Sequence, residues 1–70
     1  MDRAAKLAAE ARTLLAFDLV AAELPGITKE MLATSTRKTL AARAADLGYS
    51  TELEISAAID EALTAAGATP

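Results

Sequence analysis

Hydrophobic residues recur every three or four positions along most of this 70-residue chain, which is the spacing of one face of an α-helix. The first such segment covers residues 2–24 and precedes the turn residues Pro25 and Gly26. Its apolar stripe consists of Ala4, Leu7, Ala8, Ala11, Leu14, Leu15, Leu19 and Ala22. This pattern predicts an amphipathic helix with one buried face.

From residue 14 onward the same segment is apolar nearly all round, because Phe17, Val20 and Leu24 lie on the side away from the stripe. A helix that is apolar on every side is buried on more than one side. We therefore predict that these three residues form an interface with a protein partner or with a second copy. The alternative is that Phe17 and Leu24 pack against the next helix of the same chain.

A second helix is predicted over residues 28–47, with Thr28 as its N-cap and with Ile27 and Leu32 at the spacing of a hydrophobic staple. Its hydrophobic positions fall on two opposite sides, which suits a central helix between two others. One side carries Ala33, Leu40, Ala44 and Leu47, and the other carries Met31, Ala42 and Ala45. The run Thr-Ser-Thr at residues 34–36 predicts a weak point or a break, since these hydroxyls compete with the helical backbone.

A tight corner follows, signalled by Gly48 as a left-handed helix end and by Thr51 and Glu54 at the spacing of a capping box, with Ser50 as the alternative cap. A third helix over residues 51–66 then carries a single apolar stripe. The stripe consists of Ile55, Ala58, Ile59, Ala62, Leu63 and Ala66. The three segments predict an all-α, three-helix bundle in one domain covering residues 1–70.

The amino-acid composition indicates that the predicted core buries little hydrophobic surface. Alanine supplies 19 of the 37 hydrophobic residues, and an alanine buries far less surface than a leucine or isoleucine, which contributes roughly 1.5 to 3 kcal/mol. A chain of 70 residues is also near the size at which a lone core stabilises only marginally. We therefore expect the chain to complete its core with a second copy or with another protein.

The side-chain chemistry argues against an enzyme. The chain has no cysteine and no histidine, which removes thiolate ligands, cysteine nucleophiles and the commonest acid-base group. No phosphate-binding loop, catalytic triad or metal-ligand spacing is present, so we expect no catalytic residues, no cofactor, no metal and no small-molecule substrate. No apolar run approaches the roughly 20 residues that span a bilayer, and no signal-peptide core follows the N-terminus, which favours a cytoplasmic protein without membrane contact.

Two polar residues have unusual positions. Asp18 falls near the middle of the first apolar stripe, and a buried carboxylate needs a partner. We expect Asp18 to pair with Arg37, Lys38 or Arg43, or to face a groove between helices, rather than to act as a functional acid. Tyr49, at the corner, is expected to pack its ring on the helical hairpin rather than to recognise a ligand.

Residues 36–63 resemble the second half of the ribbon-helix-helix family of DNA-binding regulators and antitoxins. The matching positions are Leu47, Gly48, Tyr49, Ser50, Ile55, Ala58, Ile59 and Leu63. The resemblance implies a dimer whose core contains these positions and whose short strand, around residues 31–35, lies in the major groove of DNA. It also implies phosphate contacts from four basic residues, which are Lys29, Arg37, Lys38 and Arg43.

The helical pattern favours a different function from the one that the resemblance implies. About 24 residues of predicted helix precede the place where the family's strand begins, and a net charge of −3 with a pI near 4.7 argues against broad nucleic-acid affinity. We therefore predict a non-enzymatic helical protein that acts by protein-protein association, as a regulator or assembly subunit. A dimeric ribbon-helix-helix transcriptional regulator or antitoxin is the alternative.

Overall fold

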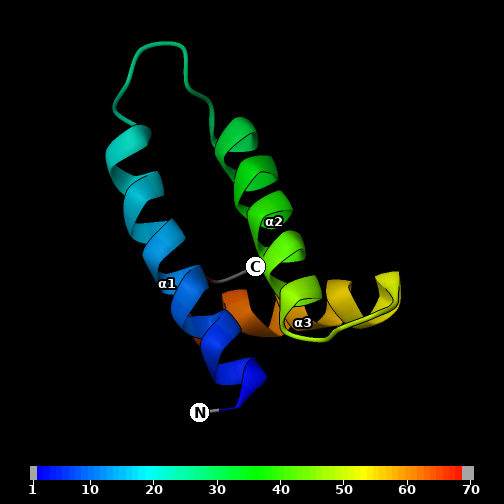
Figure 1. Ribbon diagram of the computed structural model, residues 1–70. Helices are drawn as coiled ribbons and strands as arrows, with labels where there is room; N and C mark the ends of the chain where they lie inside the picture. Colours follow the sequence, from blue (N-terminus) through cyan, green and yellow to red (C-terminus); the bar gives the residue numbers. More distant parts are fainter. Residues whose placement is uncertain (1, 69–70) are drawn as a thin grey trace.

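The computed structural model describes residues 2–68, and this part of the chain contains three α-helices and no strand (Figure 1). Helix α1 covers Arg3–Ala21, α2 covers Lys29–Asp46 and α3 covers Glu52–Ala65. All three pairs of helices are in contact. The predicted all-α, three-helix bundle is therefore confirmed, with helix ends that differ from the predicted ones by one to three residues.

The two predicted threonine caps are both present. The Thr28 hydroxyl oxygen accepts a hydrogen bond of 3.1 Å from the backbone N–H of Met31, and the Thr51 hydroxyl oxygen accepts one of 3.1 Å from that of Glu54. The return bond of the predicted capping box is displaced by one residue, because the Glu54 carboxylate accepts from the backbone N–H of Ser50 at 3.2 Å. Each helix start is thus fixed by groups within four residues of one another.

The corner between α2 and α3 also has its predicted conformation. Gly48 has a φ of +101°, in the left-handed region where a side chain is strained. The backbone N–H of Tyr49 donates to the Ala44 carbonyl oxygen at 3.1 Å, which closes the end of α2 in the manner of a Schellman motif. The guanidinium of Arg3 lies over the Tyr49 ring, 4.0 Å from its centroid. The Tyr49 ring therefore packs on the hairpin formed by α2 and α3, as expected, and links the corner between them to the start of α1.

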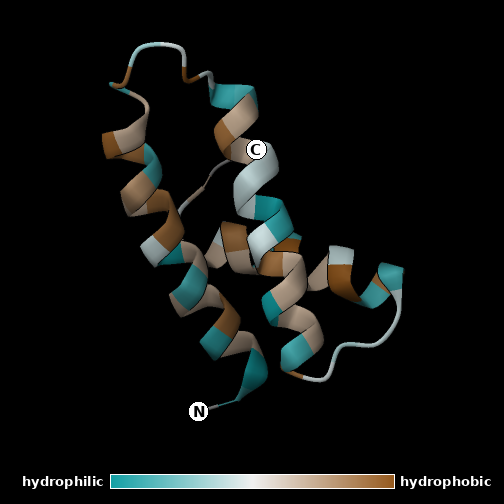
Figure 2. Ribbon diagram, turned by 45° about the horizontal axis from the view of Figure 1, so that its top comes forward, coloured by the Kyte–Doolittle hydropathy of each residue, from teal (hydrophilic) through white to brown (hydrophobic). Residues whose placement is uncertain are grey.

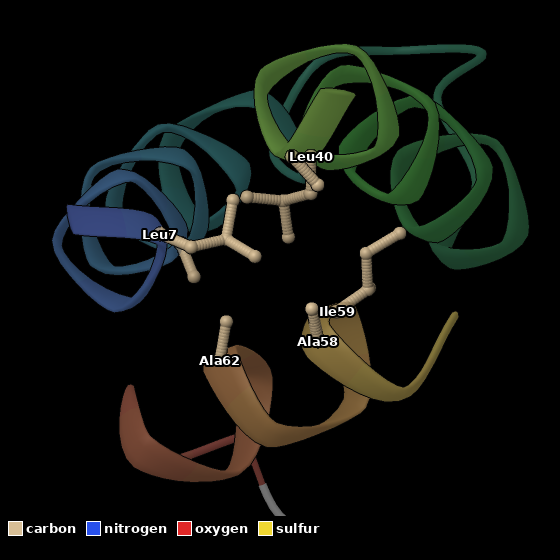
Figure 3. Close-up of a cluster of buried hydrophobic side chains, with 7 residues drawn as sticks. Leu7, Leu40, Ala58, Ile59 and Ala62 are labelled. Atoms are coloured by element: carbon tan, nitrogen blue, oxygen red, sulfur yellow. The ribbon is translucent and has the colours of Figure 1, made fainter. Parts of the chain in front are cut away.

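Helices α1 and α2 run side by side in opposite directions, and α3 crosses them near the end that is remote from their connecting loop (Figure 1). The core lies at this crossing. Leu7 of α1 and Leu40 of α2 are fully buried and point toward each other above Ala58, Ile59 and Ala62 of α3 (Figure 3). The small alanine side chains allow the three helices to approach closely. The single predicted stripe of α3 is confirmed as its packed face.

The predicted stripe of α1 is buried over only part of its length. Leu7, Ala8 and Ala11 are buried, but Leu19 is 77% exposed and Ala22 is exposed as well. The cause is the position of α3. A helix is about 10 Å across, so α3 covers only about two turns of the pair formed by α1 and α2, which is nearly 30 Å long.

The predicted sandwiching of α2 is wrong. Met31, Ala42 and Ala45, on the side opposite its packed face, are all exposed, because α1 and α3 both contact the same side of α2. The predicted break at residues 34–36 is also absent, and α2 continues through them. Thr36 is buried there, and its hydroxyl has a side-chain partner, so it does not compete for the helical backbone.

Candidate functional site

Large hydrophobic side chains are exposed mainly at one end of the molecule. Six of them are exposed among the described residues, and five of the six lie between residues 17 and 31. They are Phe17, Leu19, Val20, Leu24 and Met31, and the sixth is Leu53 in α3. Figure 2 shows hydrophobic residues continuing along α1 toward the loop that joins it to α2. We call residues 15–36, which include that loop, the distal hairpin.

The three residues predicted as a protein interface all belong to the distal hairpin and are open to solvent. Phe17 is 68% exposed, Val20 is 70% exposed and Leu24 is 57% exposed. The alternative, that Phe17 and Leu24 pack against the next helix of the same chain, is therefore wrong for the single chain. Sequence reasoning missed Leu19 and Met31, because the helical period shows which residues share a face and not how much of that face a neighbour covers.

A groove runs between α1 and α2 in the distal hairpin and ends against the C-terminal end of α3. Its volume is about 640 Å³. Most of its wall is apolar, with contributions from Leu15, Leu19, Leu32, Ala33, Leu63 and Ala66. Lys29, Asp18, Thr36 and Arg37 supply the polar part of the wall. Asp18 thus faces a groove between helices, which was one of the two predictions for this residue.

The partner of Asp18 is not one of the predicted basic residues. The Thr36 hydroxyl donates a hydrogen bond of 2.6 Å to an oxygen of the Asp18 carboxylate. Thr36 is 4% exposed, whereas Asp18 is half-buried, so water still reaches the carboxylate from the groove. Arg37 instead forms an ion pair of 2.9 Å with Asp60 of α3. The bond between Asp18 and Thr36 therefore joins α1 to α2 at the inner end of the groove.

The four basic residues of the DNA-binding alternative do not form one patch. Lys29, Lys38 and Arg43 are exposed on α2, while Arg37 is half-buried and paired with Asp60. Because a helical turn takes 3.6 residues, these four positions do not share one side of the helix. The structure thus offers no concentrated basic face along α2.

Residues 31–35, where the resemblance implied a strand, form the first part of α2. Ala58 and Ile59, which the resemblance placed in a dimer core, are buried within the single chain. Comparisons of the chain with protein-family models, curated proteins and solved structures gave no match.

Neither a metal centre nor a membrane span is found in residues 2–68. No three acidic side chains in this part of the chain come together in a way that could hold a metal ion. None of its helices combines the length and the hydrophobicity needed to cross a bilayer. The distinctive surface of the described chain is therefore the exposed apolar surface of the distal hairpin.

Proposed function

We propose that this is a non-enzymatic helical protein that acts by associating with another protein chain through its distal hairpin, as a regulator or assembly subunit. The observation that supports the proposal is the concentration of five large, exposed hydrophobic side chains within residues 17–31. Burying a side chain of this kind contributes about 1.5 to 3 kcal/mol, so covering several of them at once favours association. Phe17, Val20 and Leu24 share one side of α1 and the turn after it, and a shared exposed apolar surface marks an interaction site, whereas scattered single residues do not.

The total surface of the chain supports the same conclusion. The accessible surface is 4856 Å², whereas the scaling for folded monomers gives about 4,100 Å² for a chain of 7.2 kDa. The excess is several hundred Å². The chain therefore buries less of its own surface than a typical monomer of its mass and leaves more surface for a partner to cover.

The proposal is tested by comparing two substitutions that each place a charge at an exposed hydrophobic position. Phe17→Glu changes the distal hairpin, and Leu53→Glu changes a residue in the first turn of α3 that is 84% exposed and lies outside it. We expect both variants to keep the helix content of the wild type by circular dichroism. Only Phe17→Glu should lose the self-associated or partner-bound species detected by sedimentation and affinity capture.

Equal behaviour of the two variants, with association intact in both, would contradict the proposal. An unfolded Phe17→Glu variant would show instead that this side chain belongs to the core.

The DNA-binding alternative is tested in the same samples by fluorescence anisotropy with duplex DNA. Affinity that falls steeply with salt, and that is lost when Lys38 and Arg43 are replaced, would favour nucleic acid over protein as the partner.

A further inference from the structure

We propose that the chain covering this surface is a second copy of the protein, packed antiparallel along the outer face of α1 about a two-fold axis near residue 18. This inference rests on the proposed association through the distal hairpin and names its partner. It is carried by the order of charges along α1, which makes the outer face of the helix complementary to itself.

The outer face of α1 carries two neighbouring stripes, each with the spacing i, i+4 and i+7, and the turn after the helix end at Ala21 adds one further residue to each stripe, Glu23 to the first and Leu24 to the second. Every residue in both stripes is exposed. The first stripe consists of Arg12, Ala16, Leu19 and Glu23. The second consists of Thr13, Phe17, Val20 and Leu24. The first stripe has an apolar middle and ends of opposite charge, and the second is apolar over its last three positions.

The proposed two-fold axis is perpendicular to the plane that contains the two α1 helices. This rotation reverses the direction of the helix but keeps each stripe on the same side of the contact, so each stripe lies against the same stripe of the other copy. Both stripes have their midpoints close to residue 18. The axis therefore brings Arg12 of one copy opposite Glu23 of the other, and the same pair forms a second time by symmetry. Phe17 of one copy then lies opposite Val20 of the other.

The charges also decide the direction of packing. In a parallel pair related by a two-fold axis along the helices, each flank would lie against the opposite flank of the other copy. Arg12 would then face Thr13 and Glu23 would face Leu24, so no opposite charges would meet. Arg12 lies in α1 and Glu23 lies in the turn two residues past the helix end at Ala21, which places the two symmetric ion pairs at opposite ends of the apolar contact. The antiparallel arrangement thus has attractive ends and a hydrophobic middle.

The fold leaves this face free to be covered. Asp18, at the height of the proposed axis, points to the opposite side of α1, toward Thr36 and the groove. Helices α2 and α3 therefore lie away from Phe17 and Val20, whereas Leu19 is at the edge of the proposed contact and also lines the groove between α1 and α2. The small side chain of Ala16 lets the two helices approach closely, and the contact would cover Leu19 as well as the three residues predicted as an interface.

The test is a charge exchange in the full chain, read out as the dimer dissociation constant from sedimentation equilibrium at low salt. Arg12→Glu and Glu23→Arg, made singly, each turn two attractive contacts into two repulsive ones. We expect each single variant to weaken the dimer about five- to fifty-fold. The double variant R12E/E23R should return to within about threefold of the wild type, because the pairs are rebuilt with their partners exchanged.

Lys38→Glu is the matched control, because it changes the net charge as Arg12→Glu does but lies on α2, outside the proposed contact. It should leave the dissociation constant within about twofold. Circular dichroism checks that each variant keeps its helix content. At high salt, the single variants should converge on the wild type, because screening weakens contacts between exposed charges.

Three outcomes would overturn the inference. A wild type that stays monomeric at millimolar concentration shows that the second copy is not the partner. A dimer that is insensitive to both single exchanges, or one that the double exchange fails to restore, shows that the antiparallel contact is wrong. If Phe17→Glu still abolishes binding to a different protein, the proposed function remains supported after any of these results. The two proposals can therefore be contradicted separately.

Discussion

Replacing Thr36 by valine should destabilise the fold through the loss of one hydrogen bond. The substitution keeps the shape of the side chain and removes the hydroxyl that donates to Asp18 at 2.6 Å. Hydrogen bonds to charged groups contribute about 1.5 to 3 kcal/mol, and the loss leaves the carboxylate without this partner. Because Asp18 is only half-buried, water replaces part of the bond, so we expect a loss of about 1 to 2 kcal/mol.

That loss is large for a domain of this size. A core in a chain of this length supplies only about 3 to 5 kcal/mol, and 1 kcal/mol corresponds to about 4 to 8 °C in the unfolding midpoint. The expected decrease in Tm is therefore about 5 to 15 °C. Thermal and urea unfolding followed by far-UV circular dichroism, at one fixed protein concentration, measures it.

Thr64→Val is the matched control. The Thr64 hydroxyl also donates a hydrogen bond, of 2.9 Å, but its acceptor is the Asp60 carbonyl oxygen of the same helix and the residue is exposed. We expect this control to change stability by less than about 0.5 kcal/mol. A double-mutant cycle with Asp18→Ala should give a coupling energy of about 1 kcal/mol. Additive effects, or a Thr36→Val variant as stable as the control, would refute the reasoning.

Two further substitutions test the core and the corner. Leu40→Ala removes most of a fully buried side chain and should cost about 2 to 5 kcal/mol, which approaches the stability of the whole domain. We expect its helical circular dichroism signal to be largely lost at 25 °C, and a cooperative transition near the wild-type midpoint would contradict the packing described. Gly48→Ala places a side chain at a φ of +101° and should cost about 1 to 2 kcal/mol. A wild-type midpoint for this variant in urea would show that the corner does not require that conformation.

The distal hairpin explains why a chain with a small core still carries so much hydrophobic surface. Within residues 2–68, the core at the crossing of the three helices contains three large buried hydrophobic side chains, Leu7, Leu40 and Ile59, together with alanines. Phe17, Leu19 and Val20, farther along α1, are exposed instead. Under the proposed function, the crossing of the three helices provides stability, and the distal hairpin provides the surface for association.

The local structure could be read from the sequence because its causes are local. Thr28 and Thr51 bind backbone groups three residues away, and Gly48 relieves strain at a single position. Signals of this kind fix where helices begin and end, whatever the rest of the chain does. The helical period likewise identified the packed face of α3 and the apolar outer side of α1.

Only the tertiary structure decided which apolar residues are covered and which polar groups meet. The position at which α3 crosses the hairpin leaves Leu19 in solvent, although it shares a stripe with the buried Leu7. The packing of α1 on α2 gives Asp18 the hydroxyl of Thr36, 18 residues away, instead of a basic side chain. Periodicity assigns residues to faces of one helix, but coverage depends on how neighbouring helices are placed, and that placement is set by contacts between segments far apart in the chain.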